Sequence, residues 1–267
     1  MMIAADTHVH LYPNFDLAVL FESAREHLAL PGVFEGTKPF RILFTADRAG
    51  FPKSADLVRK PEMWRTGPMP EIEEEGGALV ALTCTGDRFV IAPGRQIISK
   101  ENLEVLALAS ECDIAEGAPV AEIINEVCAE GGVPVLPWSP GKWWFERGKA
   151  IFDLLQGTEP HAFLLGDVFM RPHVWPTPAL LQKGLESGHR ILAGSDPLDG
   201  SGEERIVGRY GILGEMRENG STEDAFHQAQ RFLREGRYRR VGARAGLETF
   251  ARRMWLAKRM KQERLAA

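Results

Sequence analysis

The residues of this chain with the clearest capacity for chemistry lie in the segment Asp6-Thr7-His8-Val9-His10. The segment begins in a short apolar run, so we expect it at the end of a first β-strand, Ile3–Thr7. In an extended chain, side chains two residues apart point to the same side. His8 and His10 can therefore bring two imidazoles to one metal ion.

A second segment, Gly194-Ser195-Asp196-Pro197, follows the last strand that the apolar pattern predicts. Catalytic side chains gather at the carboxyl ends of parallel barrel strands, and Asp196 offers a carboxylate there. We predict that His8, His10 and Asp196 hold a divalent ion. These residue types also have simpler explanations, because paired surface histidines arise by chance and Ser-Asp-Pro is a common turn or helix cap.

Two further groups of polar side chains follow expected strands. Asp47 and Arg48 follow the second strand, where we expect Asp47 to orient a ligand and Arg48 to bind an anion, because a guanidinium suits phosphate or carboxylate. Trp138 and Lys142 lie in a tryptophan-rich loop that suits a sugar ring, a nucleobase or a hydrophobic anion. The alternative is that two of the three indoles of this loop cap the core.

A third group, Asp167, Arg171 and His173, also comes after a strand. Asp167 can ligate a metal or orient a base, and the other two can meet an anion. The alternative is an ion pair between Asp167 and Arg171. The predicted catalytic set is accordingly Asp47, Arg48, Asp167 and Arg171, and the predicted substrate-binding set is Arg48, Trp138, Lys142, Arg171 and His173.

The elements that must position these side chains alternate between short apolar runs and amphipathic helical patterns. This alternation indicates a mainly parallel sheet with crossover helices. The expected strands are Ile3–Thr7, Phe40–Thr45, Ala78–Thr83, Phe89–Ala92, Leu103–Leu108, Val133–Leu136, Ala162–Leu165 and Arg190–Ala193. The expected helices lie near Phe15–Leu30, Pro119–Glu130, Lys149–Gln156 and Pro178–Ser187.

One part of the predicted sheet breaks the parallel pattern. Thr85-Gly86-Asp87 is a good turn between two strand-like runs, so we expect an antiparallel hairpin there. Residues 61–77, which contain three prolines and an acidic run, are expected to form an exposed insertion.

The composition is that of an ordinary folded protein of 267 residues, with 44% hydrophobic and 26% charged residues. No apolar run approaches the roughly 20 residues of a membrane-spanning helix. Three cysteines without a Cys-x-x-Cys pair predict neither a zinc cage nor a disulfide framework, and we expect a cytoplasmic protein.

Charge is unevenly distributed along the chain. Residues 231–267 hold 12 Lys and Arg and 3 Asp and Glu, a net charge of +9 in a chain whose total is −5. Apolar residues interrupt these charges at helical spacing, which favours an amphipathic helix packed on the body over a nucleic-acid-binding tail. The segment is also a candidate surface for a homo-oligomer.

Asp6-Thr7-His8-Val9-His10 resembles the opening Asp-x-His-x-His of the polymerase and histidinol phosphatase (PHP) domains. Later landmarks fall in the order of that family over residues 2–200, and the resembling segments are 42–48, 92–97, 104–108, 131–139 and 190–198. The resemblance implies a distorted (β/α)7-type barrel of a metal-dependent phosphoesterase. It places the barrel at residues 1–215 and leaves 216–267 as a basic helical segment packed on it.

Five positions depart from the metal-binding pattern that the resemblance implies. Arg48 stands for the second-motif histidine, Gln96 for the bridging glutamate and Leu103 or Glu104 for the next histidine, while Trp138 and Leu198 stand for the last two histidines. Neither arginine nor tryptophan ligates a metal ion. We therefore expect one divalent ion (Zn, Mn or Fe) rather than three, or none.

Two hypotheses follow. The first is a metal-dependent hydrolase of the PHP type that acts on a phosphoester or another small anionic molecule, with an amidohydrolase-type barrel as a close variant. The second is a non-catalytic PHP-like binding protein that has lost the metal cluster, in which Arg48 supplies the positive charge. The sequence leaves both open.

Overall fold

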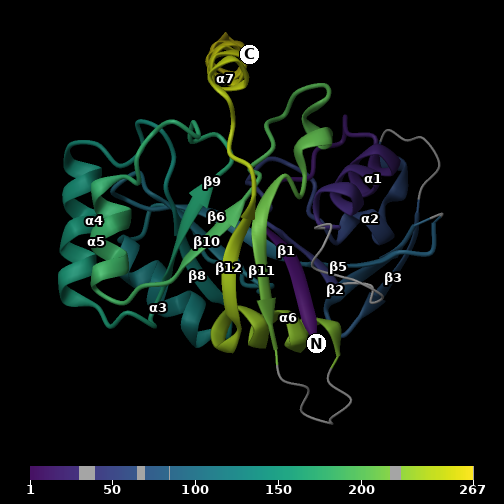
Figure 1. The fold of residues 1–267 in the computed structure, drawn as a ribbon, viewed down its shortest axis with the longest axis horizontal. Helices are drawn as coiled ribbons and strands as arrows, with labels where there is room; N and C mark the ends of the chain where they lie inside the picture. Colours follow the sequence, from purple (N-terminus) through teal and green to yellow (C-terminus); the bar gives the residue numbers. More distant parts are fainter. Residues whose placement is uncertain (30–39, 65–69, 84, 217–223, 267) are drawn as a thin grey trace.

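The computed structural model describes residues 1–29, 40–64, 70–83, 85–216 and 224–266 (Figure 1). Within these ranges the fold is mixed α/β, with two sheets and seven α-helices. The larger sheet has seven strands in the order β12 (Arg237–Gly242), β11 (Tyr210–Glu215), β1 (Met2–Val9), β2 (Phe40–Thr45), β5 (Arg88–Ala92), β4 (Ala78–Leu82) and β3 (Glu71–Glu75). The smaller sheet has five strands in the order β10 (Ile191–Gly194), β9 (Leu164–Val168), β8 (Val133–Pro137), β7 (Glu104–Leu108) and β6 (Gly94–Ile98).

Helices cover one face of each sheet. The α-helices are α1 (Leu17–His27), α2 (Asp56–Arg59), α3 (Val120–Ala129), α4 (Glu146–Gly157), α5 (Ala179–Glu186), α6 (Ala225–Glu235) and α7 (Leu247–Ala266), and two short 3-10 turns are η1 (Pro61–Met63) and η2 (Glu203–Ile206). The larger sheet is covered by α1, and the smaller one by α3, α4 and α5. In Figure 1, α3, α4 and α5 lie beside the smaller sheet and α1 lies on the opposite side of the molecule.

Three apolar clusters hold these layers together. The first contains inward side chains of both sheets, such as Ile42 and Leu192, with Phe232 of α6. The second packs α1 against the larger sheet, and the third packs α3, α4 and α5 against the smaller sheet. The apolar faces that the sequence pattern predicts thus meet between the sheets and beneath the helices.

The predicted (β/α)7-type barrel is wrong, because the described strands form two separate sheets and no closed barrel. A strand has only two edges for hydrogen bonding, and β1 uses both, one for β2 and the other for β11. β10, which pairs with β9, therefore lies against β1 without forming a ladder with it. At the other junction, β2 is occupied by β1 and β5, and one isolated bridge, Asp47–Arg95, approaches the smaller sheet.

The prediction of a mainly parallel sheet is also wrong. Four strand pairs within the described ranges are parallel and six are antiparallel. The hairpin β4–β5 is antiparallel as predicted. Four strands that the pattern did not predict, β3, β6, β11 and β12, enter antiparallel ladders.

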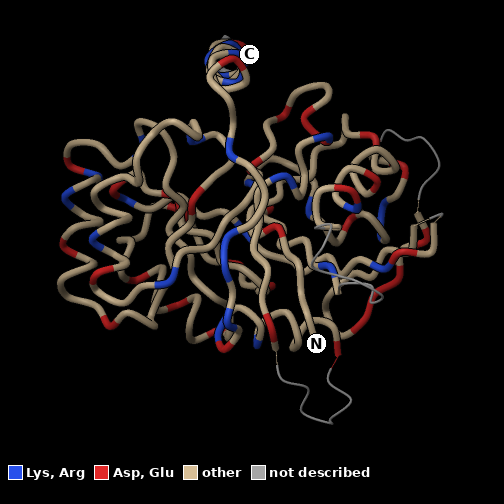
Figure 2. Tube along the Cα trace, in the orientation of Figure 1, with Lys and Arg blue, Asp and Glu red and all other residues tan. Residues whose placement is uncertain are grey.

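The predicted insertion at 61–77 contains regular structure, although residues 65–69 fall outside the described ranges. Its acidic run forms β3, which pairs with β4 and is the edge strand of the larger sheet. An edge strand keeps one side in water, so charged side chains are tolerated there and oppose pairing with other chains. These glutamates and the arginines of β12 lie at opposite ends of the larger sheet (Figure 2).

The C-terminal part combines α6, β12 and α7. β12 extends the larger sheet, Phe232 of α6 is buried in the core, and α7 lies at the top of the view in Figure 1. The division into units 1–215 and 216–267 stays a prediction. Within the described residues, we find no helix with the length and apolar character needed to cross a lipid bilayer.

Candidate metal centre

The end of β1 is fixed by the carboxylate of Asp6, which is fully buried. It accepts hydrogen bonds from three backbone N–H groups, those of His8 at 3.2 Å, Ser195 at 2.9 Å and Gly208 at 2.8 Å. These bonds join β1 to the loop after β10 and to the turn before β11. Asp6 thereby holds the two chain segments that carry the candidate ligands.

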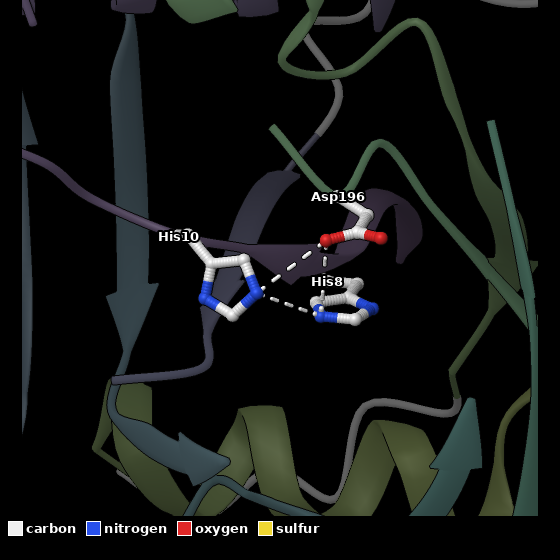
Figure 3. Close-up of side chains that lie close together, drawn as sticks. All are labelled: His8, His10 and Asp196. Atoms are coloured by element: carbon white, nitrogen blue, oxygen red, sulfur yellow. Dashed lines mark hydrogen bonds and ion pairs between the residues drawn. The ribbon is translucent and has the colours of Figure 1, made fainter. Parts of the chain in front are cut away.

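His8, His10 and Asp196 come together at this junction, as Figure 3 shows. The Nε2 atoms of the two histidines are 3.1 Å apart. Asp196 Oδ1 lies 3.6 Å from Nε2 of His8 and 3.4 Å from Nε2 of His10. Within the part of the chain that the structure describes, they form one group of His, Cys, Asp or Glu side chains whose ligand atoms are close enough for a single ion.

The separations match those expected around an ion. Ligands placed about 2.1 Å from a tetrahedral metal lie about 3.4 Å from one another. His10 meets a further requirement, since its Nδ1 lies 2.6 Å from the carbonyl oxygen of Ala46. A proton on Nδ1 that is donated to this carbonyl leaves the Nε2 lone pair free for a ligand bond. His8 Nδ1, in contrast, is buried without a hydrogen-bond partner.

The protonation states also fit a cation site. Burial lowers the pKa of His8 to about 4, so its imidazole is neutral near pH 7 and has a free lone pair. Burial by itself would raise the pKa of Asp196, but its interactions with His8, His10 and Lys142 hold it well below its ordinary value. The residues present therefore fit a divalent ion that is bound by two imidazoles and a carboxylate.

Arg48 lies beside this group and has a fixed position. Its Nη1 donates to the hydroxyl of Tyr12 at 3.2 Å, and its guanidinium lies 5.6 Å from the ring centre of Phe51. The pKa of Arg48 stays above its ordinary value despite burial because of Tyr12 and the nearby carboxylates of Glu104 and Asp196. The guanidinium thus remains charged near the candidate ligands.

Asp47 and Arg48 both line a cavity of about 340 Å³, together with the cationic Lys53 and Arg59. The carboxylate of Asp47 accepts hydrogen bonds from the backbone N–H of Ser54 at 2.8 Å and from its hydroxyl at 3.0 Å. Burial raises the pKa of Asp47 to about 6, against the opposing effect of those bonds. Arg95 and Glu111 also line the cavity, which is therefore predominantly cationic, and the carboxyl of Asp47 titrates near neutral pH.

Lys142 also lies close enough to influence the candidate ligands. Its ammonium is ion-paired with Glu104, which is within 3.4 Å of the side-chain nitrogen of Gln96. The charges of Glu104 and Lys142 both affect the pKa of His8. Lys142 is 44% exposed, so its ammonium faces solvent as well as Glu104.

The remaining predicted site residues are not part of this group. Asp167 is fully buried and bound by Arg171 at 2.5 and 2.7 Å, by the Tyr210 hydroxyl at 2.8 Å and by Arg240 at 3.2 Å. The remaining guanidinium nitrogen of Arg171, Nη1, donates hydrogen bonds to the carbonyl oxygens of Trp175 and Pro176. The ion pair that the sequence left as an alternative is thus present.

Trp138 and His173 also lie outside the group formed by His8, His10 and Asp196. Trp138 is buried in the apolar cluster beneath α3 and α4, while the neighbouring Trp144 is 58% exposed. His173 is exposed, and its Nδ1 lies 3.3 Å from the carbonyl oxygen of Ala245. Substrate-binding roles for these two residues stay predictions.

Sequence reasoning missed Tyr12 as the partner of Arg48. A signal was available, because Tyr12 follows His10 at the same two-residue spacing that joins His8 to His10. Its ring lies 6.0 Å from that of His10, and burial raises the pKa of its hydroxyl to about 12. Tyr12 therefore stays protonated near neutral pH.

Comparisons with known proteins show only a distant likeness. No protein-family model matches the chain, and no curated protein matches its sequence. Among solved structures, PsfC from Pseudomonas syringae PB-5123 is similar in fold, with a TM-score of 0.57 and 14% identity over 99% of both chains.

A second similar structure is a two-domain protein from Bacteroides vulgatus that contains a predicted PHP-like metal-dependent phosphoesterase. The TM-score is 0.47 and the identity 13%, with 91% of this chain and 65% of that chain covered. At this TM-score the likeness carries no conclusion about the activity of the present chain.

Proposed function

We propose that this protein is a metal-dependent hydrolase that holds one divalent ion on His8, His10 and Asp196 and acts on a phosphoester or another small anionic molecule. The observation that carries the proposal is the convergence of two imidazole nitrogens and one carboxylate oxygen at 3.1 to 3.6 Å. The reaction class rests on the resemblance of the Asp-x-His-x-His segment to PHP domains.

A bound divalent ion supplies positive charge and lowers the pKa of a water ligand toward neutrality. Nitrogen and carboxylate ligands suit Zn, Mn or Fe, and three protein ligands leave a position open for such a water. Asp6 fixes the backbone of His8 and Ser195, and Ala46 orients the ring of His10. These contacts hold the ligands before any ion binds.

The cations beside the ligands support an anionic substrate. The Tyr12 hydroxyl holds Arg48, whose remaining N–H groups can bind phosphate or carboxylate oxygens in a planar fork. Lys142 adds charge close to the ligands. Lys53 and Arg59 line the neighbouring cavity that contains Arg48, whose lining does not include His8, His10 or Asp196. Asp47, with its pKa of about 6, is proposed to hold or release a proton in the cavity that it shares with Arg48.

The test is elemental analysis of protein purified without added metal and after loading with Zn, Mn or Fe. We expect close to one ion per chain in the wild type and loss of that ion in His8→Ala and Asp196→Ala. His161→Ala is the matched control, because His161 is exposed and lies outside the candidate metal group. Hydrolysis of p-nitrophenyl phosphate should follow the ion content across the four proteins.

Two results would contradict the proposal. A wild type that retains no ion under any loading condition favours the second hypothesis, a metal-free protein that binds anions through Arg48. An ion that persists in both His8→Ala and Asp196→Ala would place the metal elsewhere.

A further inference from the structure

Arg253 of α7 is buried to an unusual degree for a charged side chain on a C-terminal helix. It is 0% exposed, whereas Met254 and Trp255, its neighbours along the chain, are 41% and 61% exposed. Burying a guanidinium is unfavourable unless it is paired and hydrogen-bonded. Two of the three guanidinium nitrogens of Arg253, Nε and Nη2, have hydrogen-bond partners, and Nη1 is buried without one.

Those contacts lead directly to the candidate ligand Asp196. Arg253 Nη2 donates to the backbone carbonyl oxygen of Asp196 at 2.6 Å, and Nε donates to the carboxylate of Glu203 at 3.0 Å. The same carboxylate accepts the backbone N–H of Leu198 at 3.1 Å. Arg253 and Glu203 thus bind the Asp196–Leu198 loop at two points.

The backbone of Asp196 needs such support. Its φ angle is +49°, a left-handed conformation that is unfavourable for a residue with a Cβ atom. Its N–H donates to the carbonyl oxygen of His8 at 2.8 Å, which fixes one side of the residue. The bond from Arg253 fixes the carbonyl on the other side, and together they aim the carboxylate at His8 and His10.

We propose that Arg253 is a positioning residue for the metal centre, and that α7 is consequently part of the functional site. This inference rests on the proposed function, because it concerns the ion held by His8, His10 and Asp196. Arg253 touches neither the ion nor the substrate; it acts through the backbone of Asp196. Without it, the loop can relax from the left-handed conformation and the carboxylate can turn away from the imidazoles.

The test measures affinity for Co²⁺ and the visible absorption spectrum of the Co²⁺-loaded full-length protein, in Arg253→Met, Arg253→Lys and Glu203→Gln. Removal of groups that orient metal ligands typically weakens metal binding ten- to a hundredfold, and we expect this range for Arg253→Met. Arg253→Lys should recover part of the affinity, because an ammonium can reach the Asp196 carbonyl or Glu203 but does not reproduce the guanidinium fork. The absorption spectrum of bound Co²⁺ should change in Arg253→Met and in Arg253→Lys.

Arg259→Met is the matched control. Arg259 lies on the same helix and pairs with Glu263 in solvent, so this variant should bind Co²⁺ as the wild type does. Far-UV circular dichroism and thermal unfolding of the metal-free proteins separate loss of the fold from loss of the site. If Arg253→Met does not fold, Arg253→Lys and Glu203→Gln decide the outcome by the same measurements.

The outcomes distinguish the two proposals. If the wild type binds Co²⁺ and the folded Arg253 and Glu203 variants bind it equally well with an unchanged spectrum, the positioning role is overturned and the proposed function stands. If the wild type binds no ion, the proposed function fails, and the role of Arg253 falls with it.

Discussion

Protonation of the His8 imidazole makes the stability of the metal-free protein depend on pH. The pKa of this imidazole is about 4 in the folded chain against 6.5 in an ordinary environment, because burial opposes its charged form. Between these values the unfolded state binds more protons, so the stability that His8 contributes rises with pH. It is fully present above pH 6.5 and is lost as the pH falls toward 4.

In the wild type, we expect His8 to make the free energy of unfolding rise by about 3 kcal/mol between pH 4 and 6.5. We predict that this rise is absent in His8→Gln. The measurement is urea unfolding of both proteins in the presence of a chelator. The difference between wild type and variant is needed because Asp6, whose pKa burial raises to about 6, contributes with the opposite sign over a similar range. A difference that stays constant with pH would show that His8 is not neutralised by burial.

At the scale of elements, the close approach of β10 to β1 brings Asp196 to the histidines. Gly194 makes this approach possible, because a Cβ atom at this position would lie 2.4 Å from the Cβ of His8 and 2.6 Å from its backbone nitrogen. No side chain fits there without moving β1 or β10. The glycine is thus required by packing between the two sheets rather than by a turn.

Gly194→Ala is expected to destabilise the protein by about 1 to 3 kcal/mol, the usual cost of overpacking, and to weaken metal binding. Urea unfolding and a Co²⁺ titration measure the two effects. Gly157→Ala at the end of α4 is the control, because a Cβ there meets nothing within 4 Å and stability should change by less than about 0.5 kcal/mol. Wild-type stability and affinity in Gly194→Ala would show that the strands separate at no cost.

At the scale of the whole molecule, the candidate centre joins the two sheets. His8 lies near the end of β1 in the larger sheet and His10 directly follows that strand, whereas Asp196 follows β10 in the smaller sheet. An ion bound by all three should therefore stabilise the native state as a whole. Binding to the native state alone contributes about 2.7 kcal/mol when the free ion is at 100 times its Kd.

We predict that this concentration of ion raises the Tm of the wild type by roughly 5 to 10 °C, given the usual relation between stability and Tm for a chain of this size. The shift should disappear in Asp196→Ala and persist in His161→Ala. Differential scanning calorimetry with and without the ion checks both expectations. An equal shift in Asp196→Ala would mean that the ion stabilises the protein from another position.

Other expectations about the whole molecule stay predictions. They are a small anionic partner, the absence of nucleic-acid binding, the cytoplasmic location and a homo-oligomer. Light scattering of the full chain measures the oligomeric state. Exposed Leu247, Met254 and Trp255 on α7 are the side chains to substitute if a dimer is found.

The sequence by itself determined the features that depend on near neighbours in the chain. It predicted β2 at Phe40–Thr45 and the β4–β5 hairpin, because strand patterning and turn chemistry act over a few residues. Two-residue spacing likewise predicted that His8 and His10 share a side, and the structure brings both to Asp196.

Only the tertiary structure decided which strand edges and which charged groups pair. β11 occupies the edge of β1 that a closed barrel would need for β10, and Arg171 and Arg240 occupy the carboxylate of Asp167. Arg253 reaches Asp196 across 57 residues of sequence. In each case, several segments that are distant in sequence could pair with the same strand edge or the same carboxylate. Local sequence patterns do not indicate which of these segments forms the pair.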